Sequence, residues 1–221
     1  VLQAQTAAPR VVVVGGGFGG ATVAKYLKHW GGNNLNVTLI DPKAKHTSCV
    51  LSNLVLNKQL TLKNLRFGYN DLQSKYGVEV IKDSVETIDP DGRVLTLKNQ
   101  PAQPYDILVL STGISFKRPK GWNAQEMPHA WIAGGQTNLL KKKLAAMSTG
   151  ETFIMTIPES PYRCPPGPYE RACLVADMLK SRGGGRVIVL DANSKNQAEE
   201  ETFSRAFEQL YGDIVEYYHN A

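Results

Sequence analysis

The pattern of hydrophobic and polar positions predicts alternating strands and helices from residue 10 onward. The run Arg10–Val14 is short, β-branched and apolar, as in a strand buried on both faces of a parallel sheet. Apolar residues then recur at helical spacing through Ala21–Trp30, and Asn36–Ile40 forms a second apolar run. A strand, a helix and a strand in this order indicate an α/β fold built on parallel strands.

The rest of the pattern continues this alternation in two series. The first contains a hairpin that turns at Asp89–Gly92 and ends with an apolar strand at Ile107–Leu110. The second contains a strand at Thr152–Ile157, a helix at Tyr169–Lys180, a strand at Arg186–Leu190, a helix at Glu199–Tyr211 and a strand at Ile214–Tyr218. We expect a first domain over residues 1–114, a crossover over 115–150 and a second domain over 151–221. The second domain has too few elements to close a core of its own.

A glycine-rich turn joins the first strand to the first helix. Gly15, Gly17 and Gly20 match GxGxxG, in which the glycines allow a tight turn, a close approach to a pyrophosphate and close packing of helix on sheet. Asp41 ends the second strand, where a carboxylate accepts hydrogen bonds from ribose hydroxyls. This context predicts a Rossmann-like dinucleotide-binding domain. Its predicted cofactor contacts are Gly15, Gly16, Gly17, Phe18, Gly19, Gly20, Asp41, Pro42 and Lys43.

A second motif favours FAD over NAD at this site. Tyr105 and Asp106 precede the apolar strand, and Ser111, Thr112 and Gly113 follow it. This arrangement resembles the second flavin motif of flavoproteins with two dinucleotide-binding domains, the disulfide-reductase-like superfamily. The resemblance implies that the turn after the strand approaches the flavin nucleotide. Further predicted contacts are Val85, Ser111, Thr112 and Gly113.

Composition and charge narrow the possible partners. No apolar run is long enough to span a membrane, and we expect no transmembrane segment. The net charge is +5, but the only dense basic run is Lys141–Lys143, which we interpret as a solvated helix face. We therefore expect no nucleic-acid partner and, because a positive field attracts anions, a small anionic substrate.

The three cysteines differ in their surroundings. No zinc-binding spacing and no CxxCH haem motif occurs, so we predict no metal site on this chain. Cys164 lies in a proline-rich loop beside Arg163 and Arg171, directly before a helix, which is a setting that activates redox thiols. Proline has no N–H, so this loop cannot cradle a pyrophosphate and the second domain is not expected to bind NAD(P)H in the usual way. Cys49 fits either a small buried residue or a thiolate along the FAD, and Cys173 fits a packed helix residue.

Two segments carry a specific resemblance to a known family. Cys49–Asn53 and Cys164–Arg171 resemble motifs of the flavoprotein subunits of flavocytochrome c sulfide dehydrogenases, relatives of the sulfide:quinone oxidoreductases. The resemblance implies that Cys49 carries FAD covalently and that Cys164 forms a redox-active disulfide with a cysteine outside this chain. It also implies that Glu170 is a proton carrier. The family flavoprotein is about twice as long, so the chain resembles its N-terminal half.

The resemblance also implies an activity. We expect hydrosulfide to attack the disulfide of Cys164, sulfur or polysulfide to leave, and electrons to pass through covalent FAD to a c-type cytochrome subunit. Because no CxxCH occurs here, that haem belongs to another chain. The small, polar stretch Val1–Pro9 resembles the start of a processed secreted protein, and we expect a periplasmic location.

Three alternatives remain open. A sulfide:quinone oxidoreductase performs the same oxidation of sulfide but passes electrons to a quinone. An NADH-dependent flavoprotein reductase is opposed by the proline-rich loop. A non-catalytic dinucleotide-binding fragment would bind FAD weakly or not at all and would not be reduced by sulfide.

Overall fold

Two compact units make up the described part of the chain. A computed structural model describes residues 7–221, and Val1–Thr6, part of the stretch expected to be a processed N-terminus, lie outside it. One unit comprises residues up to Ser48 together with Leu65–Trp122, and the other comprises Cys49–Asn64 together with Asn123–Ala221. Each unit has its own hydrophobic core and its own parallel sheet.

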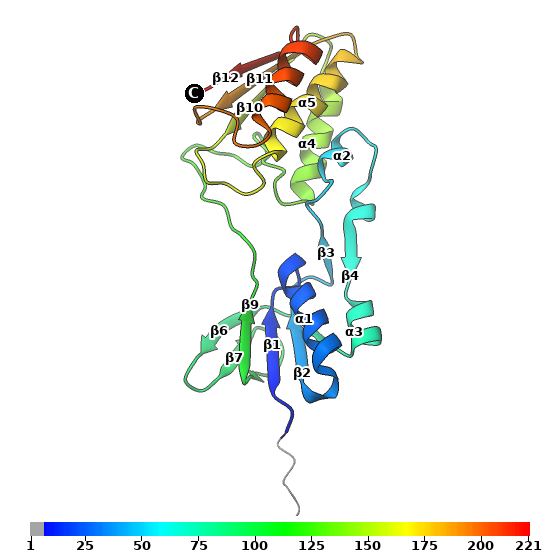
Figure 1. The fold of residues 1–221 in the computed structure, drawn as a ribbon, viewed down its shortest axis with the longest axis vertical. Coiled ribbons are helices and arrows are strands. Elements are labelled where there is room, and N and C mark those ends of the chain that lie inside the picture. The colour runs from blue at the N-terminus through cyan, green and yellow to red at the C-terminus, as the bar shows by residue number, and fades with distance from the viewer. Residues whose placement is uncertain (1–6) are drawn as a thin grey trace, which may run out of the picture. The chain divides into compact units, whose positions relative to one another are not determined.

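The first unit is built on a four-stranded parallel sheet in the order β5-β2-β1-β9. Helix α1 lies along this sheet (Figure 1). Val11 and Val13 of β1 pack with Ala24 of α1, whereas Val12 and Val14 pack in a separate cluster with Leu95 and Leu97. Strand β1 is therefore buried on both faces, as its apolar sequence predicts. The elements are β1 (Arg10–Val14), α1 (Phe18–Gly31), β2 (Asn36–Ile40), α3 (Asn70–Tyr76), β5 (Glu79–Ile81) and β9 (Ile107–Leu110).

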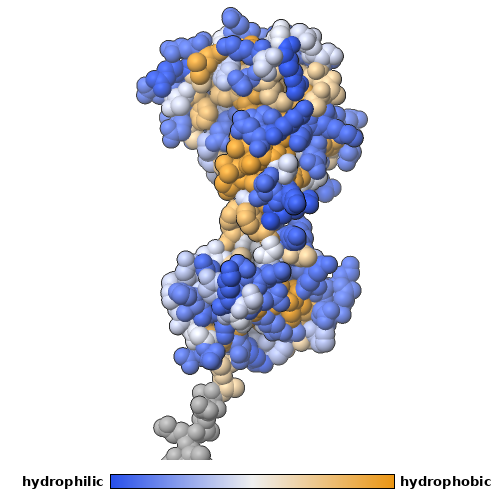
Figure 2. Space-filling view, turned by 90° about the vertical axis from the view of Figure 1, so that its right-hand side faces the viewer, coloured by the Kyte–Doolittle hydropathy of each residue, from blue (hydrophilic) through white to orange (hydrophobic). Residues whose placement is uncertain are grey.

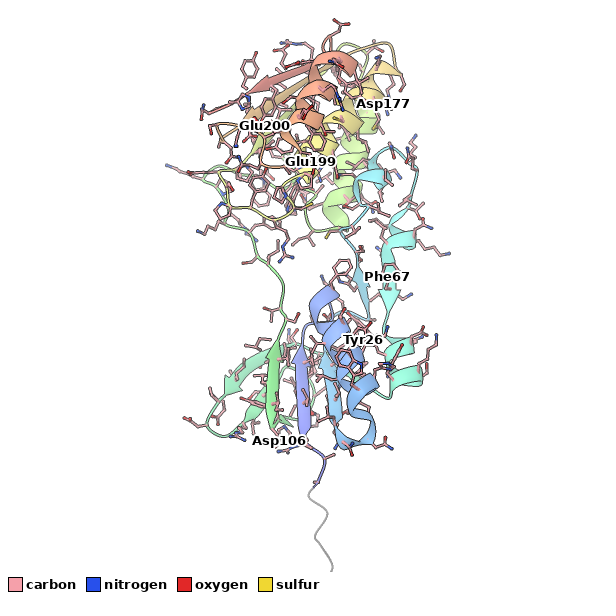
Figure 3. All side chains as sticks on the ribbon, viewed as in Figure 1. Tyr26, Phe67, Asp106, Asp177, Glu199 and Glu200 are labelled. Atoms are coloured by element: carbon pink, nitrogen blue, oxygen red, sulfur yellow. The ribbon has the colours of Figure 1, made fainter. Side chains whose placement is uncertain are left out.

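Short antiparallel elements complete the first unit. Strands β6, β7 and β8 form one sheet, and β3 pairs with β4 in another. Asp106, just before β9, accepts hydrogen bonds from the Arg10 guanidinium at the start of β1, which ties the ends of the two strands together (Figure 3). The strands are β3 (Lys45–Thr47), β4 (Arg66–Gly68), β6 (Val85–Asp89), β7 (Val94–Leu97) and β8 (Gln103–Pro104), and this unit also contains the 3-10 helix η1 (Gly32–Asn34). A second 3-10 helix, η2 (Leu62–Leu65), spans the point where the chain passes from the second unit back to the first.

The second unit has a three-stranded parallel sheet in the order β10-β11-β12. Its helices pack beside that sheet (Figure 1). The fully buried residues Tyr169, Val187 and Val189 lie in a core that also includes Leu56 of α2. The elements are α2 (Asn53–Leu56), α4 (Gly135–Ala146), β10 (Thr152–Ile157), α5 (Gly167–Lys180), β11 (Arg186–Asp191), α6 (Glu200–Arg205), a π-helical turn, η3 (Ala206–Leu210), and β12 (Val215–Tyr218).

The predicted α/β class, with one Rossmann-like unit followed by part of another, is confirmed. The core of the second unit also takes in residues outside the expected range 151–221, among them Leu56, Leu140 and Leu144. The sequence pattern gave no reason to move Cys49–Asn64 out of the first domain, yet this segment supplies α2 and buries Val55 and Leu56 in the second unit. The boundary between the units also falls at Trp122, inside the stretch expected to be a crossover.

The surface of the second unit carries exposed apolar side chains. Figure 2 shows apolar residues gathered on one face, and Val50 and Leu51 have exposed fractions of 58% and 57%. These two residues directly follow Cys49 in the sequence. Within residues 7–221, no helix combines the length and the apolar character that crossing a membrane requires.

Candidate functional site

The glycine turn after β1 has a geometry that only glycine satisfies. Gly15 has φ +100°, and a Cβ there would lie 2.2 Å from the carbonyl oxygen of Ser111. A Cβ on Gly20 would lie 1.8 Å from the carbonyl oxygen of Gly15. The first glycine therefore makes the turn beside β9, and the last lets α1 pack against that turn, as the motif predicts.

The carboxylate of Asp41 lies against the same turn. One of its oxygens accepts a hydrogen bond from the Gly16 N–H at 2.7 Å, and the other accepts one from the Lys43 N–H at 2.7 Å. Asp41 is partly exposed, and Pro42 and Lys43 are exposed. Each carboxylate oxygen keeps acceptor capacity, so the side chain can also receive ribose hydroxyls.

The start of α1 is suited to an anion. Gly17 is its N-cap, no side chain caps it and no acidic residue lies in its first turn, so backbone N–H groups and the helix dipole face outward. A Cβ at Gly17 would have only His46 as a near neighbour, at 3.8 Å. Within residues 7–221, Nε2 of His46 is buried without a hydrogen-bond partner, and burial lowers the pKa of this ring. An open glycine cradle with an orphaned imidazole nitrogen beside it fits a bound dinucleotide pyrophosphate.

The buried side chain of Tyr69 contacts the glycine turn. Its hydroxyl donates to the carbonyl oxygen of Gly16 at 3.0 Å, and a Cβ on Gly16 would lie 2.3 Å from that hydroxyl. Tyr69 is 5% exposed, and burial raises its pKa to about 12. Sequence reasoning singled out neither Tyr69 nor His46, because neither belongs to the glycine motif and no local pattern marks them.

The second predicted motif, Ser111–Gly113, begins against the glycine turn. The N–H of Ser111 donates to the carbonyl oxygen of Val14, and the Ser111 hydroxyl lies 2.7 Å from where a Cβ on Gly19 would be. Thr112 is exposed, and Gly113 has φ +82° with open space around it. Phe18 is 54% exposed at the start of α1. Val85 instead begins β6 and is partly buried against the cluster around Val12 and Val14.

In the second unit, Cys164 is exposed at the start of α5. It has φ +59°, an uncommon conformation for a residue with a side chain. Its carbonyl oxygen accepts a hydrogen bond from the Gly167 N–H at 3.0 Å. A Cβ on Gly167 would lie 3.2 Å from Sγ of Cys164 and 3.0 Å from the ring of Trp131, so glycine makes room for both at the first residue of the helix.

Arg171 is buried one turn further along α5. Its Nη1 donates to the carbonyl oxygen of His129 at 2.8 Å, its Nη2 to that of Ala130 at 3.1 Å and its Nε to Oδ1 of Asn53 at 3.2 Å. The guanidinium carbon also lies 5.4 Å from the centre of the Trp131 ring. Burial lowers the pKa of Arg171 to about 10, and the charge of Cys164 acts in the opposite direction.

Asn53 connects the segment of Cys49 to the start of α5. Its Nδ2 donates to Oε2 of Glu170 at 3.3 Å and, more weakly, to the carbonyl oxygen of Gly167 at 3.5 Å. Cys49 is exposed and belongs to the same unit as Cys164. The structure thus brings Cys164, Glu170 and the Cys49 segment into one unit, and the glycine turn, Asp41 and Ser111 into the other.

Cys173 is a packed residue, as expected. It lies partly buried against the core of the second unit. Burial raises the pKa of its thiol to about 11. A thiol in this state is a poor nucleophile near neutral pH.

Asp191 ends β11 in the same way that Asp41 ends β2, but its environment differs. It is fully buried. One carboxylate oxygen accepts hydrogen bonds from the hydroxyls of Tyr169 and Tyr217, and the other accepts them from the backbone and side-chain nitrogens of Asn193. This carboxylate is fully engaged by the unit's own groups, whereas Asp41 is partly exposed.

Comparison with known proteins assigns the class. Residues 9–145, more than half of the chain, match the pyridine nucleotide-disulphide oxidoreductase family, and the chain therefore belongs to that family. Residues 137–221 match the family described as the sulfide dehydrogenase (flavocytochrome c) flavoprotein chain, central. The resemblance expected from the two cysteine segments is confirmed by this match and by the relatives below.

Three relatives show how far the similarity extends. A sulfide:quinone oxidoreductase of Dictyostelium discoideum mitochondria is 28% identical over 190 residues, which is 84% of this chain and 42% of that protein. A flavocytochrome c sulfide dehydrogenase flavoprotein chain of Chlorobaculum thiosulfatiphilum is 54% identical over 46 residues, 21% of this chain and 94% of that sequence. The crystal structure of the sulfide:quinone oxidoreductase of Aquifex aeolicus superposes with a TM-score of 0.79 at 25% identity, covering 96% of this chain and 51% of that one. The chain thus spans about half the length of the longer relatives.

Proposed function

We propose that the protein oxidises sulfide to sulfur or polysulfide with FAD as cofactor and passes the electrons to a c-type cytochrome subunit. The observation that carries the proposal is the exposed Sγ of Cys164 at the start of α5, beside the buried guanidinium of Arg171. This pair lies in the region that matches the flavocytochrome c sulfide dehydrogenase flavoprotein family. The sulfide-oxidising names of the relatives support the same substrate.

The first unit supplies the cofactor site in this proposal. The glycine turn, Asp41 and the Ser111–Gly113 turn would hold FAD, and the exposed Cys49 would carry it covalently. When bound, FAD supplies an acceptor for an electron pair that can be passed on singly to a haem. A covalent bond would also prevent loss of the cofactor outside the cytoplasm.

The cysteine chemistry follows from thiol–disulfide exchange. Hydrosulfide attacks Sγ of Cys164 in its disulfide with a cysteine outside this chain. A sulfur–sulfur bond forms to Cys164, the old disulfide bond breaks, and the partner cysteine leaves as a thiolate. Glu170, exposed beside Asn53, is positioned in the first turn of α5 to take up or return the substrate proton. The exposed Arg163 and the buried Arg171 attract the anionic substrate.

Anaerobic titration with sulfide tests the activity directly. We expect sulfide to bleach the flavin absorbance of the purified holoprotein, and Cys164→Ser to abolish that bleaching. Cys173→Ser is the matched control and should bleach like the unmodified protein. Bleaching that survives unchanged in Cys164→Ser would exclude the proposed route through this thiol.

The covalent bond has a separate test. The intact mass of the denatured protein should exceed the polypeptide mass by one FAD, and the excess should be lost in Cys49→Ala. An unmodified mass would remove the assignment of Cys49 while leaving the sulfide titration as an independent test. Peptide mapping of the flavin-bearing fragment identifies the residue.

A quinone acceptor is the second candidate. It is favoured by the similarity over 84% of this chain to a mitochondrial sulfide:quinone oxidoreductase. Comparing sulfide-dependent reduction of a c-type cytochrome with that of a soluble quinone analogue distinguishes the two. The proposed periplasmic location belongs with the cytochrome acceptor and is tested by fractionating cells of the source organism.

An NADH-dependent reductase is opposed by two features of the second unit. Five prolines lie between residues 158 and 168, where a second dinucleotide site would need free N–H groups. The carboxylate of Asp191 is already occupied by Tyr169, Tyr217 and Asn193. NADH should therefore leave the flavin oxidised. A protein that binds no flavin and does not react with sulfide would instead be a non-catalytic dinucleotide-binding fragment.

A further inference from the structure

The second unit buries the guanidinium of Arg171, and within residues 7–221 no carboxylate pairs with it. Arg171 is 7% exposed. Within residues 7–221, the hydrogen-bond acceptors of its guanidinium are two carbonyl oxygens, those of His129 and Ala130, and the amide oxygen of Asn53. Neutral acceptors satisfy the N–H groups but leave the charge uncompensated, and an uncompensated buried charge destabilises the fold.

The uncompensated charge lies beside the exposed cysteine. The guanidinium carbon of Arg171 lies 5.4 Å from the centre of the Trp131 ring. The same ring and Sγ of Cys164 lie 3.0 and 3.2 Å from where a Cβ on Gly167 would be. The Trp131 ring therefore links the sulfur to the guanidinium near the start of α5, where the helix dipole adds a partial positive charge.

We propose that Arg171 is a positioning residue whose buried charge stabilises negative charge on the sulfur of Cys164. The anion is the thiolate of the reduced protein and, if the proposed sulfide oxidation holds, also the persulfide that forms after hydrosulfide attack. Asn53, His129 and Ala130 fix the guanidinium so that its charge is not free to turn toward solvent.

The test compares two alkylating reagents of different charge. Both iodoacetate and iodoacetamide react with the thiolate, so the ratio of their rates cancels the fraction of thiolate and reports the local electrostatic potential. The rates are followed at the Cys164 peptide by mass spectrometry, on the reduced full chain. Arg171→Gln should lower the iodoacetate-to-iodoacetamide ratio by about threefold or more, which corresponds to removing one charge several ångströms away in a water-like dielectric. Arg171→Lys, which keeps the charge, should restore most of the ratio.

Arg163→Gln is the matched control, because Arg163 adjoins Cys164 but is exposed. It should change the ratio less than Arg171→Gln does. If folded Arg171→Gln keeps the unmodified ratio, the charge of Arg171 does not act on Cys164 and the inference is overturned.

A measurement on the unmodified protein keeps the inference testable even if Arg171→Gln does not fold. Salt screens the field of an exposed arginine strongly and that of a buried one weakly. The ratio of the iodoacetate rate to the iodoacetamide rate at Cys164 should therefore change little at high salt. A large fall in this ratio would show that exposed charges, and not Arg171, produce the positive potential at the sulfur. Neither readout uses flavin or sulfide, so failure of the proposed function and failure of this inference give separate results.

Discussion

The Nε of Arg171 donates a hydrogen bond to Oδ1 of Asn53 across 118 residues of sequence. Asn53 also donates to Glu170, so one amide side chain joins α2 to two neighbouring charged residues near the start of α5. Removing this amide leaves a buried, charged donor without its acceptor. The pair therefore links the stability of the second unit to the arrangement of its candidate site.

Asn53→Ala should destabilise the second unit. We expect a loss of about 2 kcal/mol in the free energy of unfolding, because an unsatisfied buried donor on a charged group costs roughly this much. Urea-induced unfolding measures the change. Asn138→Ala, at an exposed position on α4, is the control and should have little effect. Equal effects of the two substitutions would contradict the importance of the Asn53 contact.

Two substitutions in the glycine turn should have different effects: one should lower stability, and the other should reduce flavin binding. Gly20→Ala forces a Cβ to within 1.8 Å of the Gly15 carbonyl oxygen, so the first unit should unfold at a lower urea concentration. Gly17→Ala meets only His46, at 3.8 Å, and should leave the stability of the apoprotein unchanged. The same methyl group should nevertheless reduce flavin content, because the backbone can no longer approach the pyrophosphate closely. The ratio of flavin to protein absorbance checks this, and full flavin content in Gly17→Ala would argue against the placement of the cofactor.

Tyr69 should make the first unit sensitive to alkaline pH. Its pKa is about 12 in the folded state, against about 10 for an unfolded tyrosine, so the unfolded chain loses its proton first as pH rises. The stabilisation is complete below about pH 10 and is lost between about pH 10 and 12, by roughly 3 kcal/mol. Tyr69→Phe should flatten this part of the stability curve, as measured by urea unfolding at several pH values. Tyr26→Phe, at the surface of α1, should keep the slope (Figure 3).

The three cysteines should differ in reactivity. At about pH 8, iodoacetamide should label Cys164 readily on the native, reduced protein and Cys173 only after unfolding, because burial raises the pKa of the Cys173 thiol to about 11. Cys49 should be labelled only in protein that lacks covalent flavin. Peptide mapping by mass spectrometry gives all three extents in one experiment. Rapid native labelling of Cys173 would show that the core around it opens.

The first unit could be predicted largely from sequence, because its signals are local. The β-branched run of β1, the glycine turn and the acid that ends β2 each occupy adjacent positions and each has one physical interpretation. The limits of β2 and β9 also match the predicted strands. No local pattern marks Tyr69, because its contact with Gly16 joins residues far apart in sequence.

The second unit was harder to predict for the same reason. The segment Cys49–Asn64 has no pattern that assigns it to a sheet whose first strand begins only at Thr152, yet Leu56 is buried in the core of that unit. Arg171 was recognised as a positive charge near Cys164, but its burial and its bond to Asn53 follow only from the three-dimensional packing.

The occupied carboxylate of Asp191 has a consequence for how easily the second unit could acquire a nucleotide site. Placing a glycine turn in the loop before α5 would supply N–H groups, but Tyr169, Tyr217 and Asn193 would still hold the acid that a nucleotide ribose needs. Tyr169 and Asp191 are also fully buried, so freeing that acid disturbs the interior. Acquiring a pyridine nucleotide site would thus need several coordinated substitutions, with intermediates less stable than either end point, and single substitutions would not open this route over evolutionary time.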